Sequence, residues 1–364
     1  MNKKVLSVIV AFVVVIGITA FVLLTPPAPP APPVQPAQPA QPAQPAQPAQ
    51  PVQPVQPAQP PAQEALNLKL GLTMAEGTVE TQAARKFAEE VERISNGKIT
   101  VDVLAGGLAG GEREIVEGQQ IGVMDMSVVS GILQAFDPAM KILEYDFLFK
   151  NEDHLRRVFD GPIGDKIYER LIDKAGVRVL GMFMRTPRLL TTNRPINSIE
   201  DLEGLKIRVP EMPARVALWR AMGASPTPMA FPEVFTGLQT GTIDGQENPI
   251  TVINTARFFE VVDYLAITNH VYGFMFLNIS EQSYQKLTDV QRQWIAEAAA
   301  IAVEFNNKLV KESEKELLDK VSAQMTVTHP ETSTWRERTK DVYKQFLNVE
   351  GFEELYTAIV EAGE

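Results

Sequence analysis

The stretch "LNLKLGLTMAEGTVETQAARKFAEEVERISNGKITVDVLA" (residues 66–105) has the pattern of a strand, a helix and a second strand. In residues 66–73 apolar and polar side chains alternate, which is the period of a β-strand. In residues 80–95 the apolar side chains recur at helical spacing, and Gly97 follows as the expected C-cap. Residues 99–105 form the second predicted strand. A helix between two strands predicts parallel strands joined by a crossover, so the chain is expected to be an α/β protein.

The same order continues toward the C-terminus. A helix is predicted at residues 111–122, and a very long one at residues 288–324 opens with Thr288 and Gln291 as a capping box. A helix of more than about 30 residues exceeds one small lobe, so it is expected to bridge two lobes. Further strands are predicted at residues 124–130, 177–184, 205–209 and 270–280.

Composition excludes several classes of function. The net charge of −11 argues against nucleic acid as a partner. The chain has no cysteine, which removes disulfides, cysteine-rich zinc sites and iron–sulfur clusters. His154, His270 and His329 lack metal-ligand spacing, and no nucleophile arrangement can be read. The glycine cluster at residues 105–114 lacks the ending of a phosphate loop. We therefore expect no catalytic residue, no metal and no cofactor.

Two segments at the N-terminus are not expected to contribute to a core. Residues 5–24 are an uncharged apolar run after a basic start, long enough to span a bilayer. We interpret residues 1–24 as an uncleaved membrane anchor, with a cleaved signal sequence as the alternative. Lys3 and Lys4 would then keep the N-terminus in the cytoplasm and place the rest outside the inner membrane. Residues 25–65, rich in Pro, Ala and Gln, are predicted to be a disordered polyproline-like linker rather than a docking site.

Arginines gather in "MRTPRLLTTNRPINSIEDLEGLKIRVP" (residues 184–210). Arg208 lies near the C-terminal end of a short apolar strand, just before Pro210 and a helix. A buried guanidinium needs a partner, because an unpaired buried charge costs several kcal/mol. The pattern alone favours an internal ion pair, and a ligand carboxylate is the alternative, since the planar fork of arginine fits a carboxylate.

Four stretches resemble the solute-binding proteins of TRAP transporters, the DctP family. They are "GGEREIVEGQQIGVMDMSVVS" (110–130), "TTNRPINSIEDLEGLKIRVPEMP" (191–213), "GASPTPMAFPEVFTGLQTGTIDGQENPI" (223–250) and "FFEVVDYLAITNHVYG" (258–273). The resemblance covers residues 66–364. It implies a two-lobed periplasmic-binding-protein-like clamp with shared strands and a long lobe-bridging helix. Residues 66–185 and 274–313 would form one lobe, and residues 186–273 and 314–364 the other.

The resemblance also implies the ligand-binding residues. Arg208 in "KIRVP" would grip a ligand carboxylate, with Arg188 in "TPRLLTTNRP" as a second arginine. Asn248 would supply an amide that donates to a carboxylate or accepts from a hydroxyl. Phe231 would form an apolar wall. Two weaker candidates for contacts with ligand hydroxyls are Glu76, after the first strand, and Ser130, after the third.

Three departures from the family pattern matter. Relatives that bind sialic acid carry a glutamate and an arginine in the region that reads "VVSGILQ" here (residues 128–134), so we do not expect sialic acid. In "EYDFLF" (residues 144–149) Asp146 replaces a proline that is common in relatives, and we interpret it as a local loop difference. The anchor and linker replace the usual cleaved signal peptide, and tethering would raise the effective concentration near a membrane partner.

The predicted function is therefore an extracytoplasmic, monomeric binding protein that captures an organic acid and delivers it to TRAP permease subunits in the membrane. A ligand sensor of the same fold that feeds a membrane signalling partner is the alternative, and an enzyme has no motif behind it. The ligand stays open among dicarboxylates, aromatic acids, keto acids and sugar acids, with a slight preference for hydroxylated or dicarboxylic acids.

Overall fold

The computed structural model describes residues 65–364. The predicted anchor at residues 1–24, and all but the last residue of the predicted linker at residues 25–65, lie outside this described part. Within residues 65–364, no helix combines the length and apolar character that a bilayer-spanning segment needs.

The first of two β-sheets has five strands in the order β2-β1-β3-β10-β4. β1 pairs in parallel with both β2 and β3, which confirms the crossover predicted from residues 66–105. β10 is antiparallel to β3 and β4, so the sheet is mixed. The strands are β1 (Leu66–Gly71), β2 (Ile99–Leu104), β3 (Met126–Val129), β4 (Val177–Met184) and β10 (Phe274–Ser280).

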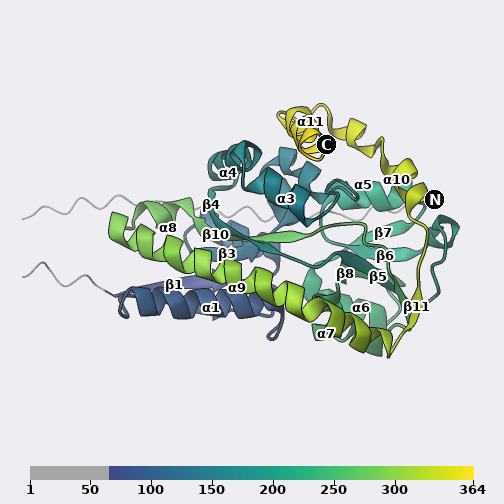
Figure 1. Cartoon of the computed structure of the whole chain (residues 1–364), viewed down its shortest axis with the longest axis horizontal. Helices are drawn as coiled ribbons and strands as arrows, with labels where there is room; N and C mark the ends of the chain where they lie inside the picture. The colour runs from purple at the N-terminus through teal and green to yellow at the C-terminus, as the bar shows by residue number, and fades with distance from the viewer. Residues whose placement is uncertain (1–64) are drawn as a thin grey trace, which may run out of the picture. The chain divides into compact units, whose positions relative to one another are not determined.

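The second sheet has six strands in the order β11-β9-β5-β8-β6-β7. β6 is parallel to β7 and β8, whereas β5 is antiparallel to β8 and β9. In Figure 1 the two sheets lie toward opposite ends of the described part. The strands are β5 (Arg188–Thr192), β6 (Lys206–Val209), β7 (Ser225–Pro228), β8 (Gly245–Pro249), β9 (Tyr264–Ala266) and β11 (Thr326–Thr328).

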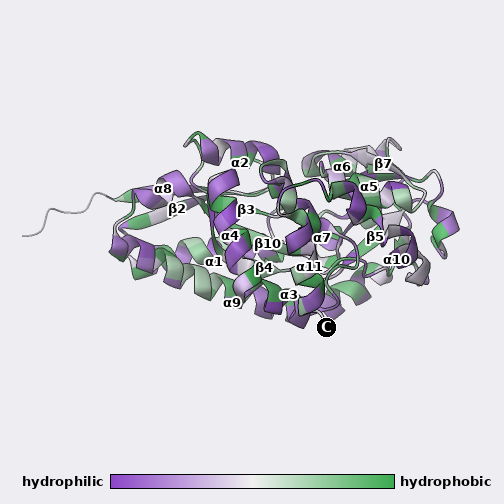
Figure 2. Cartoon of the chain, turned by 90° about the horizontal axis from the view of Figure 1, so that it is seen from above, coloured by the Kyte–Doolittle hydropathy of each residue, from purple (hydrophilic) through white to green (hydrophobic). Residues whose placement is uncertain are grey.

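Helices cover the sheets, and Figure 2 shows hydrophilic residues concentrated on outer helices such as α3 and α8. The α-helices are α1 (Val79–Ile94), α2 (Glu112–Gln120), α3 (Glu152–Phe159), α4 (Pro162–Ala175), α5 (Pro213–Ala221), α6 (Val234–Gln239), α7 (Ile250–Thr255), α8 (Glu281–Gln285), α9 (Asp289–Ser322), α10 (Ser333–Thr339) and α11 (Phe352–Ala362). Short 3₁₀ helices are η1 (Gly131–Ala135), η2 (Pro138–Glu144), η3 (Ile199–Leu202), η4 (Phe231–Glu233), η5 (Phe258–Glu260) and η6 (Val342–Phe346).

The long helix α9 has 34 residues and opens with the predicted capping box of Thr288 and Gln291. It packs along α1 and β4 beside the first sheet and reaches α7, which follows β8 of the second sheet (Figure 1). α9 packs closely against its neighbours through small buried residues, Ala298, Ala299 and Ala302. α9 therefore contacts elements beside both sheets, and the division into two lobes stays a prediction.

Two extended segments connect the sheets side by side. Residues 185–187 lead from β4 to β5, and residues 267–273 lead back from β9 to β10. The amide of Arg185 donates to the carbonyl of Gly273 at 3.1 Å, and that of Arg188 donates to Val271 at 2.9 Å. The two connections are thus paired strand-like where the chain passes between sheets.

One predicted cap lies two residues away from its expected place. α1 ends at Ile94 with Ser95 as its C-cap, and Gly97 comes two positions later. Asn96 at φ +52° and Gly97 at φ +75° both adopt the left-handed conformation, and the amide of Gly97 donates to Glu92 at 2.8 Å. Asparagine tolerates this conformation, so the turn begins one residue before the glycine.

Candidate functional site

A narrow cavity of about 60 Å³ lies where elements of both sheets meet. Several of its residues follow the C-terminal ends of parallel strands: Thr73 follows β1, Ser130 follows β3, and Met229 follows β7. Ligands of open α/β sheets bind outside the carboxyl ends of the strands, so this is the position where a site is expected. The remaining lining residues are Met74, Glu112, Arg113, Ile132, Glu144, Arg185, Arg188, Arg208, Pro210, Glu211, Met212, Ala230, Phe231 and Asn248.

Arg208 is the only buried arginine of residues 65–364 without a carboxylate partner. Its side chain lies in the cavity and the residue is only 4% exposed. Nε and Nη2 donate to the carbonyl oxygen of Met229 at 2.9 and 2.7 Å, and the guanidinium lies 5.9 Å from the centre of the Phe231 ring. Burial lowers the pKa of Arg208 to about 10, so the group stays charged at neutral pH.

The three other buried arginines each bind an acid. Arg185 donates from Nε to Glu80 at 2.6 Å, Arg188 pairs with Glu247, and Arg215 pairs with Asp146. The internal ion pair that the sequence pattern favoured for Arg208 is therefore found at its neighbours, and no such pair is present at Arg208 itself. A carbonyl oxygen carries only a partial charge, so the full charge of Arg208 remains uncompensated.

Arg188 already has an ion-pair partner within the protein, Glu247. Its Nη2 donates to Glu247 Oε1 at 2.9 Å and to the Glu247 carbonyl at 2.6 Å. The opposite carboxylate oxygen of Glu247 also lies 3.2 Å from Nε2 of His270, which is fully buried. Although burial raises the pKa of Glu247, the charges of Arg188 and Arg215 hold it well below its usual range. Arg188 lines the cavity, and its predicted clamp role stays a prediction.

Five of the six predicted binding residues line the cavity: Arg208, Arg188, Asn248, Phe231 and Ser130. The amide of Asn248 donates to Gln246 at 2.6 Å, which fixes its orientation. The sixth, Glu76, is not brought to the cavity. It is exposed and pairs with Arg85, whose Nε donates to it at 3.0 Å, because the loop after β1 turns toward solvent at this residue.

Three acids in the cavity were not predicted from the sequence: Glu112, Glu144 and the exposed Glu211. Glu112 is half-buried in the first turn of α2, and Glu144 is buried at the end of η2. Burial raises the pKa of Glu112 to about 7 and also raises that of Glu144. Glu112 lies in the stretch 110–130 that resembles the family, and Glu144 begins the stretch 144–149 that departs from it, but neither residue was identified there as a binding residue.

Asp146, which the sequence suggested to be a local loop difference, has a specific partner. Its side chain is fully buried and pairs with Nη1 of Arg215 on α5, a residue that no sequence pattern singled out. Nη2 of the same arginine lies 3.3 Å from Glu144 Oε2. Asp146 therefore supplies a negative charge to a buried arginine and ties α5 to the segment after η2.

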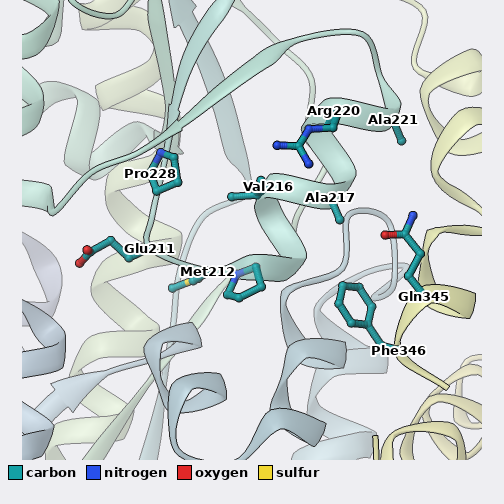
Figure 3. A pocket seen from close by; sticks show the side chains of 10 residues that line it. Glu211, Met212, Val216, Ala217, Arg220, Ala221, Pro228, Gln345 and Phe346 are labelled. Atoms are coloured by element: carbon teal, nitrogen blue, oxygen red, sulfur yellow. The ribbon is translucent and has the colours of Figure 1, made fainter. Parts of the chain in front are cut away.

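A larger groove of about 620 Å³ lies beside the cavity and shares Glu211 and Met212 with it. Figure 3 shows Val216, Ala217 and Arg220 of α5 on one side, and Gln345 and Phe346 of η6 on the other. Its only arginine, Arg220, is exposed. The groove is larger than the cavity, but the buried guanidinium without an acidic partner, that of Arg208, lies in the smaller cavity.

Comparison with known proteins agrees with this fold. The family model described as bacterial extracellular solute-binding protein, family 7 (DctP), matches residues 70–349. A TRAP periplasmic solute-binding protein from Roseobacter denitrificans, solved with bound L-galactonate, is 37% identical with a TM-score of 0.78, covering 83% of this chain and 100% of that one.

Two further relatives show how widely the resemblance extends. The sugar acid-binding protein of Advenella mimigardefordensis, solved with galactonate, is 27% identical with a TM-score of 0.79, covering 82% of this chain and 98% of that one. The sialic acid-binding periplasmic protein SiaP of Vibrio cholerae is 34% identical over 284 residues, which is 78% of this chain and 88% of SiaP. The chain therefore belongs to the bacterial extracellular solute-binding proteins of family 7, the DctP-type solute-binding proteins of TRAP transporters.

Proposed function

We propose that this TRAP solute-binding protein captures a hydroxylated organic acid by binding its carboxylate to Arg208. The observation that carries the proposal is the buried guanidinium whose only hydrogen-bond acceptor within residues 65–364 is a carbonyl oxygen. A ligand carboxylate supplies the missing negative charge. Charge-assisted hydrogen bonds of this kind are about twice as strong as neutral ones.

The surroundings of Arg208 suit such a ligand. Phe231 provides an apolar face beside the guanidinium, and the fixed amide of Asn248 offers a polar contact. Ser130 and Thr73 add hydroxyl groups from the first sheet. Relatives solved with galactonate carry the same fold, and sugar acids present one carboxylate on a chain of hydroxyl groups. A sugar acid is therefore our preferred ligand class.

Closure of two lobes around the ligand is the mechanism that we propose. The lining comes from both sheets, and the paired connections at residues 185–187 and 267–273 are the natural hinge. The lobes would be residues 66–185 with 274–313 and residues 186–273 with 314–364. The ligand would draw the walls together by bridging Arg208 of the second sheet to groups of the first, and the loaded protein would then release the acid to the TRAP permease.

We also propose that residues 1–24 tether the protein, as a monomer, to the outer face of the inner membrane through the linker at residues 25–65. The support is the apolar run at residues 5–24 and the proline-rich composition that follows it. Recovery of the full-length protein in the membrane fraction after high-salt and alkaline washes is the expected result. Recovery in the soluble fraction, with a mass reduced by cleavage, would support the signal-sequence alternative.

The binding proposal is tested by thermal stabilisation of the full-length protein with a panel of organic acids. A ligand at about 100 times its Kd adds roughly 2.7 kcal/mol to the free energy of unfolding, which is a rise of several degrees in Tm. We expect sugar acids to stabilise and the corresponding neutral sugars to have no effect. Absence of a shift with every acid, on protein shown by mass spectrometry to be free of bound ligand, would contradict the proposal.

A further inference from the structure

We propose that Glu144, together with Glu112, forms an acidic wall of the cavity that recognises ligand hydroxyl groups and rejects a second carboxylate. The inference rests on the proposed function, since it assumes that Arg208 binds one carboxylate. It narrows the ligand from organic acids in general to hydroxylated monocarboxylates, and it makes Glu144 a specificity-determining residue.

Arginines and glutamates from segments beside both sheets line the cavity. Arg188 begins β5 and Arg208 lies on β6, both strands of the second sheet. Two further arginines line the cavity from the side of the first sheet: Arg185, which is paired with Glu80, and Arg113, which is half-buried on α2.

Glu112 begins α2, which leads into β3, and Glu144 ends η2, so these two acids follow strands of the first sheet. A third acid, Glu211, follows β6 of the second sheet and is exposed. A ligand that reaches from Arg208 toward Glu144 passes from a cation of the second sheet to a buried carboxylate beside the first.

Contacts with Arg215 and with the backbone of Gly131 fix the position of the Glu144 carboxyl group. Nη2 of Arg215 lies 3.3 Å from its Oε2. The other oxygen, Oε1, lies against the backbone of Gly131, where an added Cβ would be only 2.3 Å from Oε1 and 2.2 Å from Cδ. Only glycine leaves room for the carboxyl group here. Within the described part of the chain, Oε1 has no hydrogen-bond partner of its own.

Arg215 is committed to this arrangement by Asp146. The guanidinium is 1% exposed, and its Nη1 pairs with the buried Asp146 while Nη2 contacts Glu144. One arginine therefore faces two carboxylates, so it orients Glu144 without cancelling the acidity of this side of the cavity. The unusual Asp146 thereby acquires a role, because it fixes the arginine that positions Glu144.

Glu112 and Glu144 would distinguish a ligand hydroxyl group from a second ligand carboxylate by its charge. A ligand hydroxyl can donate to a carboxylate or accept from a carboxylic acid, so it pairs with Glu112 and Glu144 in either protonation state. Burial raises the pKa of both groups, which shows that added negative charge is costly at this position. A second ligand carboxylate would add such charge, and like charges brought together in a buried site destabilise the complex.

Matched ligand pairs test the inference on the full-length protein. Titration calorimetry with D-galactonate and galactarate, and with D-gluconate and D-glucarate, compares acids that differ only in a terminal alcohol or carboxylate. We expect at least one aldonate to bind 30-fold or more tightly than its dicarboxylate partner. Glu144→Gln should narrow that ratio tenfold or more, because the amide no longer repels the second carboxylate. Glu117→Gln, an exposed glutamate of α2 outside the cavity, should leave the ratio unchanged.

A second variant, Gly131→Ala, tests the role of Glu144 without removing its charge. Gly131→Ala adds a methyl group where the Glu144 carboxyl lies, at a backbone position whose φ is not in the left-handed region. It should displace the carboxyl group and lower aldonate affinity tenfold or more, even if Glu144→Gln folds poorly. Unchanged affinity of Gly131→Ala for the preferred aldonate would overturn the role of Glu144.

Failure of this inference is distinguishable from failure of the proposed function. If the wild-type protein binds a dicarboxylate as tightly as the aldonate, and Arg208→Ala abolishes both, the acidic wall is wrong and the carboxylate site stands. An unchanged ratio in Glu144→Gln would likewise overturn the acidic wall alone. If the wild-type protein binds none of these acids or any other carboxylate, both proposals are overturned.

Discussion

The guanidinium of Arg208 donates two hydrogen bonds to one carbonyl oxygen, that of Met229, at 2.9 and 2.7 Å. Seven residues further along the chain, Arg215 is equally buried but pairs with Asp146 and contacts Glu144. The two arginines therefore differ in their partners: Arg215 faces two carboxylates, and Arg208 has no acidic partner within residues 65–364.

Replacing Arg208 should cost the ligand-free protein little stability. Arg208→Met removes a buried charge that has no ion-pair partner, at the expense of two hydrogen bonds to Met229, so the free energy of unfolding should stay within about 1 kcal/mol of the wild type. Urea denaturation of ligand-free protein measures this. A loss of more than about 3 kcal/mol would mean that Arg208 has a structural partner after all.

Replacing Arg215 should be far more damaging. Arg215→Met leaves Asp146 and Glu144 buried without their cation, and breaking a buried pair typically costs about 3–5 kcal/mol. Adding Asp146→Leu should restore part of that loss, because the stranded carboxylate is removed. The same urea series, arranged as a double-mutant cycle, measures a coupling that we expect to exceed about 1 kcal/mol. Strict additivity would show that the pair is not coupled.

Glu112 should make ligand-free stability fall as pH rises. Its pKa is raised from 4.5 to about 7 by burial, so between these values the folded state holds a proton that the unfolded state releases. The contribution of Glu112 to stability is therefore lost as pH rises through this range. Relative to Glu112→Gln, the wild-type Tm should drop by roughly 2–6 °C between pH 5 and pH 8. A constant difference across that range would contradict the shift.

Glu247 should show the opposite dependence on pH. Despite its burial, the charges of Arg188 and Arg215 hold its pKa well below the usual value of 4.5. Its stabilising contribution is thus fully present above pH 4.5 and is lost as pH falls further. Glu247→Gln should cost about 2–5 kcal/mol at pH 7, and the gap from wild type should shrink at pH 3.5. A gap that widens in acid would exclude this ionic role.

Much of the fold could be predicted from periodicity. The strand–helix–strand pattern of residues 66–105 predicted the parallel pairing of β1 and β2, and the length of residues 288–324 predicted the bridging helix. The mixed direction of the second sheet could not be read, since alternation within a strand says nothing about the direction of its neighbour. Partners far apart in sequence, such as Arg188 and Glu247, are set by that sheet pairing.

The site was predicted unevenly for the same reason. Arg208 and Asn248 lie in stretches that resemble the family. The contact between Glu144 and Arg215 forms only when η2 and α5 pack together, so it cannot be read from the sequence. Asp146 departs visibly from the family pattern, but its partner is 69 residues away in the chain. The direction in which Glu76 points depends on the loop after β1, where the exposed side chain pairs with Arg85. Sequence motifs located the strands that line the cavity, but they did not locate the buried charges of Glu144, Asp146 and Arg215.

The central claim is that Arg208 binds the ligand carboxylate, and one calorimetric comparison tests it most directly. The acid that most stabilises the wild-type protein is titrated into the wild type, Arg208→Ala and Arg220→Ala, the last being an exposed arginine of α5 in the neighbouring groove. The account predicts a loss of about 2–5 kcal/mol of binding free energy for Arg208→Ala. It predicts affinity within threefold of wild type for Arg220→Ala. Wild-type affinity in Arg208→Ala would contradict it.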